Sequence, residues 1–205
     1  LEDTEDVESV EWMSELEVDG KGNYLSSANN LNMIYANDSR LKSKFKLNLF
    51  DNKNYITATM PWRSIKKAEP ISNVDYSGIR NYIESIYGIT GTLKIDDALN
   101  LEFYRNAFHP IREYLKSLEW DGQSRIDTLL IDLFGCEDNI YTREAIRKQL
   151  VASVARVYNP GVMYHMVLVL CGVEQGTGKS SFISWLGKGW ASDSFMGWTG
   201  KESME

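Results

Sequence analysis

A glycine-rich loop between an apolar run and a helical pattern constrains this sequence more than any other feature. The apolar run MVLVLC spans residues 166–171 and lacks polar alternation, so it predicts a strand buried on both faces, as in a parallel α/β sheet. The loop GVEQGTGKSS follows at residues 172–181, and apolar spacing over 182–186 predicts a helix after it. Strand, glycine-rich loop, Lys-Ser and helix are the parts of a phosphate-binding P-loop, or Walker A loop.

The residue types in this loop suit the binding of nucleotide phosphates. Glycines let backbone N–H groups turn inward around the phosphates, and the helix start adds unpaired N–H groups and the positive end of its dipole. The pattern predicts that Lys179 contacts the β- and γ-phosphates and that the Ser180 hydroxyl binds Mg²⁺. The loop departs from the strict pattern at Val173, where a glycine is expected, although Gly172 precedes it. Either valine replaces the first glycine, or the loop contains one extra residue.

The region before the loop is predicted to be mostly helical, with one β-hairpin. Apolar residues alternate over 44–49 and return over 55–60 around a turn at 51–54, which predicts the hairpin. Helical spacing recurs in segments from residue 75 to residue 158. The predicted fold class is therefore α/β: a mostly helical accessory region with a hairpin, followed by the first strand–P-loop–helix unit of an NTPase domain. The expected boundaries are an acidic linker or tail at 1–19, the accessory region at 20–105, and a helical lead-in with the N-terminal part of the NTPase domain at 106–205.

Charge is divided unevenly along the chain, so the net charge of −7 conceals a basic segment. Residues 1–19 hold nine acids and no base, whereas residues 40–67 hold eight bases and one acid, with aromatic residues between the bases. Two interpretations of the basic hairpin stay open. Its lysines either contact nucleic-acid phosphates, with Lys44, Lys46 and Lys53 as the candidates, or keep an exposed sheet edge soluble.

Cysteine usage and hydropathy favour a cytoplasmic protein without a membrane partner. Cys136 and Cys171 lie far apart in sequence, no apolar run approaches the length of a membrane span, and the N-terminal stretch is acidic. The chain begins with Leu1 and ends at Glu205 soon after the predicted strand and helix, so we expect a fragment of a longer protein.

Several stretches resemble the virulence-associated protein E family of phages and mobile genetic elements. They are FHPIREYL at 108–115, LEWDG at 118–122, RIDTLL at 125–130, the segment 152–160 that leads into the loop, SDS at 192–194 and TGKE at 199–202. The resemblance covers the chain from about residue 12 to its end, and residues 108–202 are its specific part.

The resemblance implies a P-loop NTPase of the AAA+ type, similar to superfamily 3 and D5-like replicative helicases, with ATP and Mg²⁺ as cofactors. It implies DNA as a partner, either single-stranded or origin duplex, together with a primase and assembly into a homo-oligomeric, hexameric ring. Lys179 is the catalytic residue that transfers by position. The implied nucleotide contacts are Gly176, Thr177, Gly178, Lys179, Ser180 and Ser181. Walker B, sensor and arginine-finger residues would follow Glu205, so this chain alone is expected to bind ATP weakly and to hydrolyse it poorly.

Two functions are compatible with these features. The first is an ATP-dependent DNA helicase or replication NTPase. The alternative is a non-catalytic DNA-binding initiator module that uses the nucleotide as a conformational switch. A small-molecule kinase is disfavoured, because its P-loop would lie near the N-terminus, whereas 165 residues precede the predicted strand here.

Overall fold

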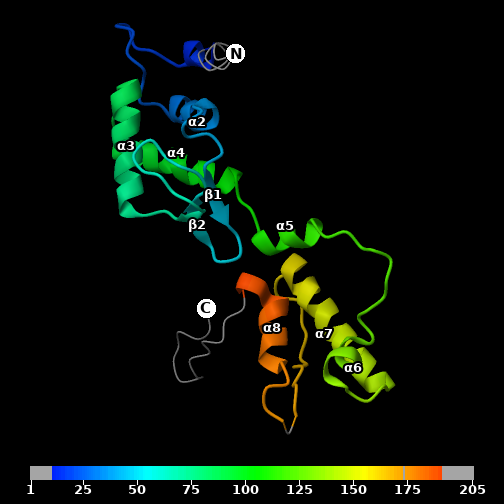
Figure 1. The fold of residues 1–205 in the computed structure, drawn as a ribbon. Helices are drawn as coiled ribbons and strands as arrows, with labels where there is room; N and C mark the ends of the chain where they lie inside the picture. The colour runs from blue at the N-terminus through cyan, green and yellow to red at the C-terminus, as the bar shows by residue number, and fades with distance from the viewer. Residues whose placement is uncertain (1–10, 173, 191–205) are drawn as a thin grey trace. The chain divides into compact units, whose positions relative to one another are not determined.

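The computed structural model describes residues 11–172 and 174–190. Sequence predictions for residues 1–10, for Val173 and for residues 191–205, including the SDS and TGKE stretches, lie outside the described residues. The chain divides into two compact units, Leu1–Leu118 and Glu119–Glu205. The described part is a mostly helical α/β structure with one small antiparallel sheet (Figure 1), which agrees with the predicted class at this level.

The first unit contains the sheet and most of the buried core. Its elements are the 3₁₀ helix η1 (Glu11–Glu15), α2 (Ala28–Asn37), β1 (Phe45–Asn48), β2 (Lys53–Ile56), β3 (Glu69–Pro70), α3 (Asn73–Tyr87), α4 (Thr92–Arg105) and α5 (Pro110–Lys116). Inward-facing Phe45 packs edge-on between Tyr35 of α2 and Phe103 of α4. Ile79 and Ile83 of α3 are fully buried in the same core. The apolar spacing that predicted these helices therefore corresponds to their buried faces.

The predicted hairpin is confirmed, with shorter strands. Strands β1 and β2 pair antiparallel, with Lys46 opposite Tyr55 and Asn48 opposite Lys53. Two features of this sheet were not predicted. The two-residue strand β3 pairs with β2, and Phe108 lies along the outer edge of β1, where its N–H donates to Leu47 O at 2.9 Å and its carbonyl accepts from Leu49 N at 2.8 Å.

The described part of the acidic segment is packed, in contrast to the solvated linker or tail predicted for residues 1–19. Leu16 is buried in the first core, and Trp12 and Met13 pack against it. Asn30 of α2 anchors the segment, because its side chain accepts from Glu17 N and donates to Glu17 O, both at 2.8 Å. The prediction failed here because the abundant charges obscured three apolar residues, two in the short 3₁₀ helix and one directly after it, that pack on the core.

Helix α3 begins at Asn73, two residues before the predicted start at residue 75. The N–H and the hydroxyl of Ser72 both donate to the Asp75 carboxylate, at 2.9 and 2.6 Å, so these two residues fix the first turn. Asp75 is itself buried and also accepts hydrogen bonds from Trp62 and Arg63. The cap therefore ties the helix to the segment that follows β2.

The second unit consists of α6 (Leu129–Phe134), α7 (Ile140–Tyr158), α8 (Lys179–Gly187) and the short 3₁₀ helix η2 (Lys188–Trp190). The Asn139 side chain begins α7 by accepting from Thr142 N at 2.8 Å. Leu130, Ile146 and Phe182, from α6, α7 and α8, form a small buried cluster. In the described residues, no helix is both long and apolar enough to cross a membrane.

The strand predicted for residues 166–171 is not formed, and the complete strand–loop–helix unit is therefore absent from the described structure. The segment lies between α7 and α8 (Figure 1). Leu168 and Leu170 pack on the small cluster, whereas Val167 is 83% exposed and Val169 is 71% exposed. A strand requires a hydrogen-bonded neighbour, and within residues 11–172 and 174–190 no segment pairs with this one. Its apolar composition predicted burial on two faces, and only one face is covered.

Candidate functional site

The glycine-rich loop leads directly into α8, which begins at Lys179. Gly178 occupies the N-cap position with φ of 83°, and Gly176 has φ of 79°. These left-handed conformations are readily accessible to glycine and strained for residues with a Cβ. The two glycines therefore permit the turn that brings the loop back over the start of the helix.

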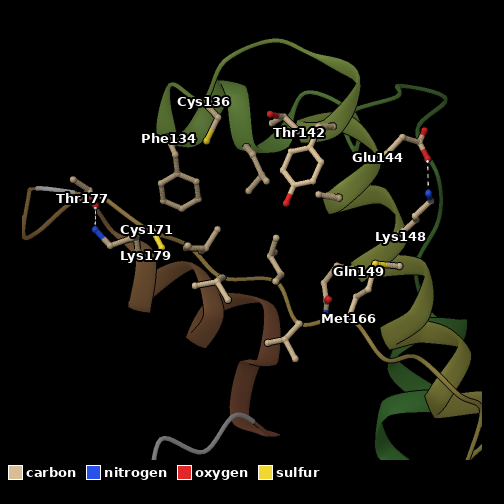
Figure 2. Close-up of a pocket in the computed structure, with 18 of the residues that line it drawn as sticks. Phe134, Cys136, Thr142, Glu144, Lys148, Gln149, Met166, Cys171, Thr177 and Lys179 are labelled. Carbon is tan, nitrogen blue, oxygen red and sulfur yellow. Dashed lines mark hydrogen bonds and ion pairs between the residues drawn. The ribbon is translucent and has the colours of Figure 1, made fainter.

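The Lys179 ammonium lies against the loop that precedes it. Its Nζ donates to Glu174 O at 3.1 Å and to Thr177 Oγ1 at 2.8 Å, and the second contact is drawn in Figure 2. A Cβ placed on Gly172 would lie 3.3 Å from the same nitrogen, so the lysine reaches the first residue of the loop. Both acceptors are neutral, and in the described part of the chain no carboxylate pairs with this ammonium. Its charge is therefore available to an anion in the loop.

The remaining predicted loop residues line one hollow of about 420 Å³. Its lining consists of Gly172, Glu174, Gln175, Gly176, Thr177, Gly178, Lys179, Ser180 and Ser181. Ser180 and Ser181 belong to the first turn of α8, whose N–H groups have no acceptor within the helix. Backbone donors, one ammonium and two hydroxyls suit phosphate oxygens, and an exposed hydroxyl suits a hard cation such as Mg²⁺. The residues present therefore fit a nucleotide phosphate chain with its cation.

A second cavity of about 600 Å³ adjoins this hollow and shares Gly172, Thr177 and Lys179 with it. Figure 2 shows the cavity between α6, α7 and the extended segment, with Phe134 near one end and Gln149 near the other. The Gln149 Oε1 atom is buried and has no hydrogen-bond partner among residues 11–172 and 174–190. Cys136 and Cys171, both free thiols, also line the cavity. Sequence reasoning missed these lining residues; the only available signal was a glutamine among the apolar positions of α7.

The three lysines predicted to contact DNA lie in the first unit, on the hairpin. The register of β1 and β2 places Lys46 and Lys53 on one face, opposite the buried face of Phe45 and Ile56. Lys44 directly precedes β1, and its carbonyl accepts from Thr57 N at 2.9 Å, which continues the pairing and puts Lys44 on the same face as Lys46. Lys44 Nζ donates to Thr59 O at 3.0 Å, and Lys46 Nζ lies 5.9 Å from the centre of the Phe108 ring. The side chain of Lys53 is exposed.

Comparison with known families connects the second unit to a named domain. The family model of the virulence-associated protein E-like domain matches residues 115–205. This part of the chain is similar to the virulence-associated protein E-like domain. The resemblance found in the sequence is thereby confirmed for this region, and the matched domain includes α6, α7, α8 and the whole glycine-rich loop. No curated protein matches the chain.

Proposed function

We propose that this chain is part of an ATP-dependent replication NTPase, a DNA helicase of a phage or mobile genetic element, and that its glycine-rich loop binds ATP with Mg²⁺. The observation that supports this proposal most is the position of Lys179 at the start of α8. Among the described residues, its ammonium bonds only to neutral oxygens of the loop. A cation held in this way can exchange those oxygens for phosphate oxygens without breaking an ion pair, which lowers the cost of binding.

Each part of the loop has a role in this proposal. The N–H groups of the first turn of α8 bind phosphate oxygens, and the helix dipole favours their negative charge. Lys179 neutralises charge on the β- and γ-phosphates and is the proposed catalytic residue, while Ser180 holds Mg²⁺. Bound ATP supplies a phosphoanhydride bond, whose cleavage would drive movement along DNA. Thr177 holds the lysine in place before the nucleotide binds.

The family match supports this assignment at the level of the domain, since the matched region contains the loop. We propose DNA as the partner, either single-stranded or origin duplex, with an associated primase. We further propose that the full-length protein acts as a hexameric ring.

The test is ATP turnover by the full-length protein, measured with and without DNA. We expect turnover that DNA stimulates, and a loss of at least about 100-fold in Lys179→Ala, because an ammonium that stabilises phosphoryl-transfer charge is worth several kcal/mol. Lys116→Ala is the matched control, because Lys116 is an exposed lysine of α5 outside the loop. Turnover in Lys179→Ala equal to that of Lys116→Ala would refute the proposed site. Tight ATP and DNA binding without any turnover would instead favour the initiator module with a nucleotide switch.

A further inference from the structure

One face of the hairpin and the loop beside it form a row of lysines, which we call the lysine strip: Lys44, Lys46, Lys53, Lys66 and Lys67. The first three share a face because residues two apart on a strand point the same way, and because cross-strand partners face together. In the strand register, Lys53 of β2 lies opposite Asn48 of β1, and Lys46 of β1 lies opposite Tyr55 of β2, so the strip includes residues of both strands.

A tertiary contact brings Lys66 and Lys67 to one end of this row. Lys44 Nζ donates to Thr59 O at 3.0 Å, and Thr59 Oγ1 in turn hydrogen-bonds the backbone of Ile65 at 3.4 Å. Lys66 and Lys67 follow Ile65 directly and are both exposed. The strip therefore combines residues from the hairpin with residues from the loop before β3.

The positive charge of the strip is not neutralised inside the unit. In the part of the chain that the structure describes, none of its five lysines forms an ion pair. The neighbouring acids are already engaged: Glu69 and Asp75 both pair with Arg63, and Asp51 at the hairpin turn accepts from the Tyr55 hydroxyl at 2.7 Å. Asp51 offsets only the end of the strip at Lys53.

Protection of an exposed sheet edge is a weak explanation for these lysines, because much of that edge is covered. The outer edge of β1 is hydrogen-bonded to Phe108, and the outer edge of β2 is paired with β3. Edge lysines discourage pairing with another chain where backbone groups are free. Here Leu47 O, Leu49 N and the outer edge of β2 already have partners, so edge protection accounts for only part of this row of lysines.

We infer that the lysine strip binds the phosphate backbone of nucleic acid, without reading base sequence. The inference deepens the proposed function by naming the surface that contacts DNA, and it rests on that function for the partner. From Lys44 to the level of Lys53, four residues along the strand, the strip spans about 13 Å, or about four nucleotides of one duplex strand. Aromatic rings are available beside it for base stacking, with Tyr55 half-buried on the same face and Phe50, at the turn, 48% exposed.

The test compares two triple variants of the full chain, each losing three positive charges. Lys44→Gln, Lys66→Gln and Lys67→Gln alter the strip. Lys21→Gln, Lys94→Gln and Lys116→Gln are the matched control. Both sets also remove one lysine bond to a backbone carbonyl, because Lys94 Nζ donates to Ser26 O. Affinity for single-stranded and duplex DNA is measured by fluorescence anisotropy over a series of salt concentrations, without nucleotide, after circular dichroism has established that both variants fold.

We expect the strip variant to bind more weakly and to lower the slope of log affinity against log salt. If each lysine contacts one phosphate, the magnitude of the slope falls by about 2.7 with duplex DNA or about 2 with single-stranded DNA. The DNA form, duplex or single-stranded, whose affinity falls more is the one that the strip binds. An unchanged slope, or an equal loss in the control variant, would overturn the inference. Loss of binding to anionic phospholipid vesicles with unchanged DNA binding would overturn it too, and would assign the strip to a membrane surface.

The inference and the proposed function fail separately. Lys179→Ala should bind DNA as the unmodified chain does, because Lys179 is not part of the strip. DNA binding that depends on the strip, in a protein without ATP turnover, would refute the motor and leave the strip intact. If Lys179→Ala loses ATP turnover while the strip variant binds DNA normally, the inference about the strip is refuted and the proposed motor stands.

Discussion

At the scale of single residues, Gly78 is required by its neighbour. A Cβ at this position of α3 would lie 2.4 Å from two ring atoms of Trp62. The ring cannot move away freely, because its Nε1 donates to the buried Asp75 carboxylate at 3.0 Å. The glycine therefore allows the indole to pack directly on the helix backbone, even though glycine is otherwise unfavourable inside a helix.

We expect Gly78→Ala to destabilise the first unit by about 1–3 kcal/mol, the usual cost of overpacking a core. Helix propensity alone would give the opposite sign, a gain of about 1 kcal/mol. Gly20→Ala is the control, because a Cβ there meets nothing within 4 Å. Urea unfolding followed by tryptophan fluorescence measures both. A stabilised Gly78→Ala variant would mean that Trp62 does not lie on α3.

Asp75 makes the stability of the first unit depend on pH. Burial by itself would raise the pKa of Asp75, but hydrogen bonds from Arg63, Ser72 and Trp62 outweigh it and hold the pKa below the usual value. Because the folded-state pKa is lowered, the contribution to stability is complete above the unfolded pKa of about 3.9 and is lost as the pH falls toward the folded value.

We therefore expect the unfolding free energy of the first unit to decrease between about pH 5 and about pH 2, and Asp75→Asn to flatten that decrease. At pH 7 the substitution should cost about 3 kcal/mol, because it leaves Arg63 without its buried partner. Asp97→Asn, on the exposed side of α4, serves as the control. Equal pH dependence in the Asp75→Asn and Asp97→Asn variants would contradict this role.

At the scale of elements, the extended segment 166–171 differs most from what its sequence predicts. Helices form from bonds within one segment, so their periodic patterns were sufficient to locate α3, α4 and α7. A strand depends on a partner that its own sequence does not specify. The same limit applies to β3, which has two residues and is fixed by pairing with β2.

Hydrogen exchange should distinguish the elements. We expect the slowest amides in β1, β2, α3 and α4, whose side chains form the larger core, and fast exchange over residues 166–171, whose backbone groups have no strand partner in the described structure. Mass spectrometry of the exchanged chain measures both regions in one experiment. Protection of 166–171 comparable to that of α4 would mean that this segment is paired in solution.

At the scale of the whole molecule, the sequence was sufficient to predict the mostly helical class, the hairpin and the family of the C-terminal region. It also located the loop, because Gly176, Gly178, Lys179 and Ser180 are local in sequence. Features that depend on contacts between distant segments were not predictable. The cover of β1 by Phe108, the packing of Leu16 and the bond from Lys44 to Thr59 all arise from tertiary structure.

The central claim is that the loop at residues 172–181 binds a nucleotide with Mg²⁺. Its most direct test is a calorimetric titration of this chain with ATP, with and without Mg²⁺, in the unmodified protein and in Lys179→Ala and Ser180→Ala. We expect weak, saturable binding that Mg²⁺ strengthens, lost in Lys179→Ala, and insensitive to Mg²⁺ in Ser180→Ala. ATP binding that is equal in all three proteins would contradict the assignment of this loop.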